Sequence, residues 1–349
     1  MKRRNLVQLI AAGALGAGLL GMSTVSAVAQ DVTLRLHQFL PPPANIPKNI
    51  LVPWAEEVAV ASGGRIRIEM FDAMALGGRP PELMDQAQDG VVDIIMTLGG
   101  YTPGRFPRSE VFELPFMMTD PVATALAYQQ MVEDDFQNNE FSDVKILAAW
   151  VHGPGVIHTQ GGVYKLEDMA GIKLRGPTRV INDLLKELGA TPVGMPVPAV
   201  PEALSKGVID GTVIPWEVTP ALKLSELVHK HTEFGGDEAL YTATFVLAMN
   251  KARYEALPDD LRAALDSVSG AHLSEFAASV MLSHDKPGRD IAVAAGNEIT
   301  TLDETEIARW KVAAAPVVTR WIADMEARGI DGQALIDRAK ALIAEKSAN

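Results

Sequence analysis

Apolar and polar residues follow two different periods along the first third of the chain, and the two periods succeed one another. Residues 32–37 and 65–71 alternate between apolar and polar side chains, which is typical of half-buried strands. Residues 50–61 carry apolar side chains at helical spacing, and a second helix, opened by proline, is predicted over 80–89. Residues 91–96 form a mostly apolar run that predicts a buried strand. This order favours a parallel sheet with helices on its faces.

A second unit of alternating strands and helices is predicted beyond residue 145. Short strands are expected over 172–175, 191–195 and 209–214, with a helix over 178–188 between the first two. Ligands of such α/β units sit beyond the carboxyl ends of the strands. The sequence therefore predicts an α/β protein of two units.

The remaining third of the chain is mostly helical in pattern. The run 242–249 is rich in β-branched and aromatic residues and is expected to cross back into the sheet of the first unit. A helical pattern then covers 258–297, and Pro287 is expected to kink or break it, because proline removes a helical hydrogen bond. Two further amphipathic helices are predicted over 304–328 and 332–345.

The first residues have the pattern of an export signal. Residues 2–4 are basic, residues 9–22 are apolar, and the small residues that end at Ala29 fit an A-x-A cleavage pattern. The alternative is a membrane anchor, but the apolar run is shorter than the roughly 20 residues that a spanning helix needs. We therefore expect residues 1–29 to be a signal peptide, cleaved near Ala29.

Composition excludes several classes of function. The formal net charge is −13, so the chain has no general attraction for nucleic acid or for an anionic membrane surface. There is no cysteine, which excludes disulfides, thiolate metal sites and cysteine nucleophiles. The common motifs of serine hydrolases, zinc proteases and nucleotide-binding proteins are absent from the sequence. An anion site in this acidic chain has to be a local cationic pocket.

Short motifs at turns between helices and strands occur in a particular order. They are Ser-Gly-Gly-Arg-Ile at 62–66, Ala-Leu-Gly-Gly at 75–78, Gly-Val-Val-Asp at 90–93, Tyr-Thr-Pro-Gly-Arg-Phe-Pro at 101–107, Glu-Leu-Pro-Phe at 113–116, Leu-Glu-Asp-Met-Ala-Gly-Ile-Lys-Leu-Arg at 166–175, Leu-Gly-Ala-Thr-Pro-Val at 188–193 and Gly-Val-Ile-Asp-Gly at 207–211. Each motif alone is weak. In this order, behind an export signal, the chain resembles the solute-binding proteins of tripartite ATP-independent periplasmic (TRAP) transporters, of the C4-dicarboxylate-binding (DctP-like) type, over nearly its whole mature length.

This resemblance implies a periplasmic-binding-protein-like fold of two α/β lobes, joined by a hinge and by a long C-terminal helix that spans them. The first lobe would hold residues 30–151 and about 241–280. The second lobe, with the hinge-spanning helices, would hold 152–240 and about 281–349. Such a protein captures a small organic acid in the periplasm and delivers it to integral membrane permease subunits, without a cofactor and without catalysis.

Arg175 is the family's most characteristic residue, because it ends the Gly-Ile-Lys-Leu-Arg motif. A guanidinium group donates two parallel hydrogen bonds to a carboxylate, a match that lysine cannot make. The amides of the helix that begins near Thr178 would help to hold an anion. The alternative is a structural surface arginine paired with a neighbouring acid.

Several other pocket positions carry apolar residues where relatives with sugar-acid or dicarboxylate ligands often have polar ones. The candidate ligand-binding residues besides Arg175 and Thr178 are Phe39, Arg79, Met96, Thr97, Leu98, Gly155, Val197, Ile214 and Trp216. An apolar pocket with one arginine disfavours a hydroxyl-rich acid, because each desolvated hydroxyl without a partner costs about 1–3 kcal/mol. We therefore expect an aromatic or otherwise apolar monocarboxylate. A 2-oxo acid, a dicarboxylate and a sugar acid remain alternatives, and Met96, Leu98 and Ile214 have a second interpretation as sheet core.

Arg79 would change the expected ligand if it faced the pocket, since it would serve a second anionic group or a ring hydroxyl. An exposed Arg79 is the alternative. Glu217, beside Trp216, is a weak candidate for a metal ligand, and we expect no metal. Two other functions stay open at this point, namely an exported enzyme acting on an organic acid and a binding protein that presents its ligand to a sensor.

Overall fold

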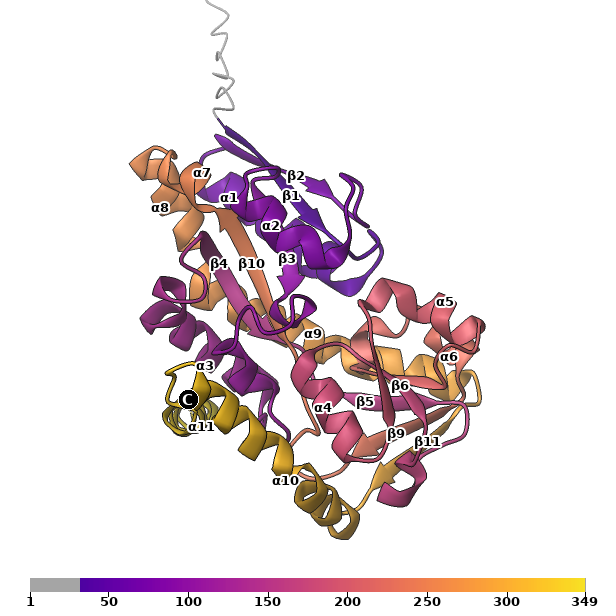
Figure 1. Cartoon of the computed structure of the whole chain (residues 1–349). Coiled ribbons are helices and arrows are strands. Elements are labelled where there is room, and N and C mark those ends of the chain that lie inside the picture. Colours follow the sequence, from indigo (N-terminus) through magenta and orange to yellow (C-terminus); the bar gives the residue numbers. More distant parts are fainter. Residues whose placement is uncertain (1–31, 349) are drawn as a thin grey trace, which may run out of the picture.

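The computed structural model describes residues 32–348, and the predicted signal peptide lies outside the described residues (Figure 1). The chain forms two separate sheets, each with its own helices, which we call the first and second lobes. Among the described residues, no helix is both long enough and apolar enough to cross a membrane. The predicted fold class, two α/β lobes, is confirmed.

The first lobe is built on a sheet of five strands in the spatial order β2-β1-β3-β10-β4. Its strands are β1 (Val32–Gln38), β2 (Ile66–Phe71), β3 (Ile94–Leu98), β4 (Val144–Val151) and β10 (Thr244–Asn250). β1 runs parallel to β2 and to β3, whereas β10 lies antiparallel between β3 and β4. The strand predicted near residues 242–249 therefore does return to the first sheet, and the chain crosses between the lobes on either side of it.

The second lobe is built on a sheet of six strands in the order β11-β9-β5-β8-β6-β7. Its strands are β5 (Val156–Thr159), β6 (Lys173–Gly176), β7 (Thr191–Gly194), β8 (Gly211–Ile214), β9 (Lys230–Phe234) and β11 (Glu298–Leu302). β6 is parallel to β7 and β8, while β5 is antiparallel to β8 and β9. Both sheets are thus mixed rather than purely parallel.

Helices cover these sheets and connect the two lobes. They are α1 (Val52–Ala61), α2 (Leu83–Gln88), α3 (Pro121–Asp134), α4 (Arg179–Glu187), α5 (Val200–Ser205), α6 (Leu224–Leu227), α7 (Lys251–Glu255), α8 (Asp259–Ser267), α9 (Gly270–Ala294), α10 (Glu304–Ala327) and α11 (Gly332–Ser347). α11 packs on α3 of the first lobe, whereas α10 contacts α4 of the second. The residue boundaries proposed for the two lobes stay a prediction.

The long helix α9 connects the lobes, because it packs on α3 and β4 of the first and on the short turn Trp216–Val218 of the second (Figure 1). The expectation of one helical pattern over 258–297 was wrong, and the break expected at Pro287 does not occur. The helix is interrupted before Gly270, whose φ is 59°. Helix α9 then continues through Pro287 without a break. Packing on both lobes holds the helix together where proline removes a hydrogen bond.

Gly288 explains how α9 approaches the second lobe so closely. A β-carbon at this position would lie 2.2 Å from the carbonyl oxygen of Trp216 and 2.9 Å from its carbonyl carbon. Both are backbone atoms, so they have no side-chain torsion by which to move aside. Only glycine fits at this contact without separating the helix from the turn.

Candidate ligand-binding site

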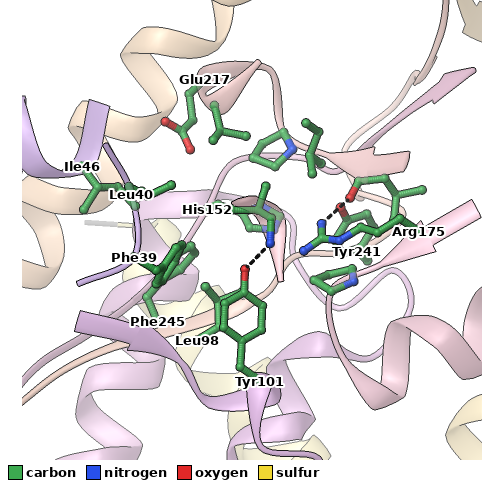
Figure 2. Close-up of a pocket in the computed structure, with 16 residues that line it drawn as sticks. Phe39, Leu40, Ile46, Leu98, Tyr101, His152, Arg175, Glu217, Tyr241 and Phe245 are labelled. Atoms are coloured by element: carbon green, nitrogen blue, oxygen red, sulfur yellow. Dashed lines mark hydrogen bonds between the residues drawn. The ribbon is translucent and has the colours of Figure 1, made fainter. Parts of the chain in front are cut away.

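A cavity lies where β1 and β3 of the first lobe and β6 and β8 of the second lobe end (Figure 2). Counting the part that is open to solvent, it encloses about 400 Å³, within the range of small-molecule sites, roughly 300–1,000 Å³. Its lining consists of Phe39, Leu40, Ile46, Leu98, Tyr101, His152, Arg175, Pro177, Val197, Val213, Ile214, Pro215, Glu217, Val218, Tyr241 and Phe245. The position at the carboxyl ends of strands is the one that the sequence predicts for a ligand.

Arg175 supplies the positive charge of this cavity. It lies on β6 with only 1% of its surface exposed. Its Nε donates to the carbonyl oxygen of Met195 at 2.8 Å, and its Nη1 donates to that of Val213 at 3.4 Å. No acidic side chain in the described part of the chain forms an ion pair with it. The alternative of an exposed arginine paired with an acid is therefore wrong.

A buried guanidinium group without an acidic partner is expensive, because desolvation disfavours its charge. Burial lowers the pKa of Arg175, although arginine stays protonated in proteins. Two backbone carbonyls offset part of this cost but carry no formal charge. A carboxylate that entered the cavity would supply the missing negative charge.

Two tyrosine hydroxyl groups lie beside the guanidinium. The hydroxyl of Tyr101 accepts a hydrogen bond from the backbone N–H of Val197 at 2.9 Å, and its own hydrogen remains available. The hydroxyl of Tyr241 is buried and has no hydrogen-bond partner within residues 32–348. Burial raises the pKa of both tyrosines, so both remain O–H donors at neutral pH. With Arg175 they form a cluster of three hydrogen-bond donors, which we call the donor cluster.

His152 adds a neutral ring to the wall of the cavity. Burial lowers its pKa to about 4, so the ring is uncharged at neutral pH. Its Nδ1 lies 2.5 Å from the carbonyl oxygen of Gly153, which identifies Nδ1 as the protonated nitrogen. The ring also packs edge-on against Tyr241, with centroids 5.5 Å apart. His152 thereby fixes the orientation of Tyr241 without adding a second charge.

The walls between the donor cluster and the far end of the cavity are apolar. Phe39 follows β1 and lies against Tyr101, with ring centroids 5.3 Å apart. Leu98 ends β3, Ile214 ends β8, and Val197 lies at the start of a short turn. These four residues were proposed from the sequence, and all four line the cavity together with Arg175.

Four further candidates lie behind the lining or away from it. Met96 and Thr97 are buried inside the first sheet, and the side chain of Arg79 is 81% exposed and paired with Glu82 at 2.8 Å. Trp216 donates from Nε1 to Glu233 and packs on the histidines of the second sheet. None of the four belongs to the lining of the cavity.

Gly155 and Thr178 support the cavity from outside. The N–H of Gly155 donates to the carbonyl oxygen of Tyr241 at 3.1 Å, and a β-carbon on Gly155 would lie 2.0 Å from the Tyr241 ring. Gly155 therefore allows Tyr241 to lie where it does. Thr178 caps α4 by accepting from the N–H of Ile181 at 3.4 Å, and a β-carbon on Gly100 of the first lobe would lie 2.3 Å from the Thr178 methyl group.

A model of a known family, bacterial extracellular solute-binding protein, family 7, matches residues 39–324 of the chain. The chain belongs to this family. The match covers both lobes and the whole cavity lining, in agreement with the predicted resemblance. The protein is therefore a TRAP-type solute-binding protein, of a family whose members act outside the cytoplasm.

Solved structures of TRAP solute-binding proteins resemble this one closely. A protein from Rhodoferax ferrireducens T118, in complex with copurified benzoate, is 50% identical, with a TM-score of 0.89; the match covers 91% of this chain and 99% of that one. A marine metagenome protein specific for aromatic acid ligands, in complex with 3-hydroxybenzoate, is 46% identical, with the same TM-score and coverage. A Bordetella bronchiseptica protein with bound mandelate is 29% identical, with a TM-score of 0.83, over 90% and 99% of the two chains.

The lobes of this TRAP solute-binding protein are held together across the cavity mouth. The Tyr101–Val197 bond joins them beside Arg175. On the side of α4, Arg179 pairs with Glu110 of the first lobe through Nη2 at 2.5 Å. Each of these contacts joins a residue of the first lobe to one of the second. Within the described residues, no cluster of three or more acidic or histidine side chains could hold a metal ion.

We predict that Tyr241→Phe weakens the binding of a carboxylate ligand about 10-fold or more while leaving the fold intact. Hydrogen bonds to charged groups contribute about 1.5–3 kcal/mol, whereas the hydroxyl that is removed has no partner in the protein itself. Titration calorimetry with benzoate would measure the change. Tyr254→Phe, which removes a hydroxyl bonded to Asp266 outside the cavity, is the control. Equal affinities of Tyr241→Phe and the unmodified protein would remove Tyr241 from the donor cluster.

Proposed function

We propose that this protein captures an aromatic monocarboxylate in the periplasm and delivers it to the membrane permease of a TRAP transporter. The carboxylate lies on Arg175, between the hydroxyl groups of Tyr101 and Tyr241, and the ring lies among Phe39, Leu98 and the other apolar walls. One observation carries the proposal: a fully buried arginine without an acidic partner opens onto a cavity whose walls are mostly apolar.

The apolar walls decide between the candidate classes of acid. Burying an aromatic ring contributes about 25 cal/mol for each Å² of apolar surface removed from water. A second carboxylate placed against Leu98 or Ile214 would lose its hydration and gain no cation, a cost that exceeds this contribution. Arg79 does not change this balance, because it is exposed and paired with Glu82. The ligands of the three similar proteins, benzoate, 3-hydroxybenzoate and mandelate, support the same class.

The proposal also includes the location of the protein and the absence of a reaction on its ligand. Residues 1–29 act as a cleaved signal peptide, which brings the protein to the periplasm. The cavity holds its ligand without converting it, because Arg175 and the two tyrosine hydroxyl groups serve as hydrogen-bond donors that bind a carboxylate. Incubation of the protein with its ligand should return the acid unchanged.

A calorimetric panel of acids tests the proposed ligand class. Benzoate, 3-hydroxybenzoate and mandelate should bind the mature protein, and succinate, malate, pyruvate and a hexuronate should bind at least 100-fold more weakly. This difference follows from about 3 kcal/mol of uncompensated desolvation, the upper end for one buried polar group. Tight binding of a dicarboxylate or a sugar acid, without binding of any aromatic acid, would refute the proposed ligand while leaving the family unchanged.

A further inference from the structure

One polar group of the cavity lies away from the donor cluster. The carboxyl group of Glu217 lies across the cavity from Arg175, near Leu40 and Ile46 (Figure 2). Only 6% of the residue is exposed. A buried acid inside an apolar wall is costly unless its oxygen atoms have partners. Its surroundings therefore indicate what the far end of the cavity can accept.

The two oxygens of this carboxyl group differ. Oε2 accepts a hydrogen bond from Nδ2 of Asn45 at 3.0 Å, which joins the two lobes. Asn45 is itself oriented by Asn49, whose Nδ2 donates to the Asn45 side-chain oxygen at 2.9 Å. Oε1 has no hydrogen-bond partner in the described part of the chain. One oxygen of Glu217 is therefore held by the protein, and the other is left for a ligand.

Burial keeps the carboxyl group of Glu217 mostly protonated at neutral pH. Burial raises its pKa to about 8, and the neighbouring carboxylate of Asp285 adds to this shift. Asp285 accepts from the backbone N–H of Glu217 at 2.9 Å and has a pKa of about 7, raised mainly by burial. Because Oε2 accepts from Asn45, the proton of Glu217 belongs on Oε1, where it can be donated to an oxygen atom in the cavity.

We propose that Glu217 recognises a hydroxyl group on the ring of the ligand, so that the preferred ligand is a hydroxy-substituted aromatic acid. This inference rests on the proposed function, since it needs a ligand whose carboxylate lies on Arg175. A phenol suits Glu217 in either protonation state, because its oxygen accepts from the acid and its hydrogen is donated to the carboxylate. A second carboxylate is opposed at this end by Asp285 and by any ionised fraction of Glu217.

Paired ligands test the proposal without changing the protein. Hydroxybenzoates and the methylbenzoates of matching position, substituted at the 3- and 4-positions, have nearly the same shape. We expect the hydroxyl compound to bind at least 10-fold more tightly than the methyl compound at one of these positions. A methyl compound that binds as well as or better than its hydroxyl partner at both positions would overturn the proposal.

Variants then assign the preference to Glu217. Glu217→Leu should reduce the ratio of the two affinities, hydroxyl compound against methyl compound, to about one. Glu217→Gln, which keeps an acceptor for Asn45 and a donor for the ligand, should keep part of the ratio and serves if the leucine variant does not fold. Glu202→Leu removes an exposed acid of the second lobe and should change nothing. A ratio that persists in Glu217→Leu, or disappears fully in Glu217→Gln, would overturn the assignment.

These measurements separate the two proposals from one another. Benzoate carries no ring hydroxyl, so its binding depends on the donor cluster and the apolar walls and needs no hydroxyl contact with Glu217. If benzoate binds but no hydroxyl preference is seen, the proposed function stands and the role of Glu217 is wrong. If no aromatic acid binds at all, both proposals are wrong.

Discussion

Replacing Arg175 with alanine is expected to weaken the binding of benzoate by about 2–5 kcal/mol, roughly 30- to 4,000-fold, the range for truncating one partner of a buried charge pair. Arg175 is the only lysine or arginine in the lining of the cavity, and His152 is neutral, so no other cation there replaces the guanidinium. The folded state should survive, because the variant also removes an unpaired buried charge. Titration calorimetry measures the affinity, and the melting temperature of the ligand-free variant checks the fold.

Two further variants make this test specific to the geometry of Arg175. Arg175→Lys keeps the charge but loses the planar pair of donors, and it should recover only part of the affinity. Arg79→Ala removes an exposed arginine outside the cavity and should leave the affinity unchanged. An Arg175→Ala protein that binds benzoate as tightly as the parent protein would contradict the assignment.

Gly288→Ala is expected to lower the free energy of unfolding by about 1–3 kcal/mol, the usual cost of an added methyl group in a packed interior. The added carbon would lie 2.2 Å from the Trp216 carbonyl oxygen, so α9 and the turn Trp216–Val218 have to separate. This turn carries Glu217 and Val218 into the cavity wall. The affinity for ligand should therefore fall together with the stability. Chemical denaturation and calorimetry of the same samples measure the two effects.

Gly161→Ala provides the matched control for this substitution. A β-carbon at Gly161 meets no atom within 4 Å, and the backbone there is not in the left-handed region. The same chemical change should thus be neutral or slightly stabilising, because it restricts the unfolded chain. If Gly288→Ala is as stable as Gly161→Ala and binds ligand normally, close packing of α9 on the turn is not needed for the cavity.

The periodicity of apolar residues predicted the strands and helices whose side chains follow a clear pattern. It failed for elements that are stabilised by contacts with residues distant in the chain. The parallel strands β1 and β2 were found because apolar and polar side chains alternate along them. β9 was missed because its buried faces carry His231 and Thr232, polar residues that lie inside the sheet. His231 is tolerated there since its Nδ1 lies 2.7 Å from that of His158, a partner 73 residues away. Such a pairing leaves no local pattern in the sequence.

The site was predicted best where one family motif or one apolar substitution marked a residue. Arg175 ends such a motif, Leu98 and Ile214 end strands, and Phe39 directly follows one. Tyr101 was missed although it opens a quoted motif directly after β3, a position that points to the cavity.

Tyr241 and Glu217 gave weaker indications. Tyr241 precedes the strand that returns to the first lobe, and Arg175, which lies beside it in the cavity, is distant in the chain. Trp216 was proposed from the sequence as a ligand-binding residue, whereas its neighbour Glu217 is the one that lines the cavity. The sequence does not show which way the side chains of two adjacent residues in a turn point.

The uncompensated charge of Arg175 links the shape of this protein to what it carries. Closing the lobes without an anion transfers a cation from water into an apolar cavity, at a cost of several kcal/mol. Closing them with a carboxylate transfers a neutral pair instead. The closed shape should therefore be rare in unloaded molecules and common in loaded ones. A permease that binds only the closed shape would rarely be occupied by empty binding proteins, even where these outnumber the loaded ones.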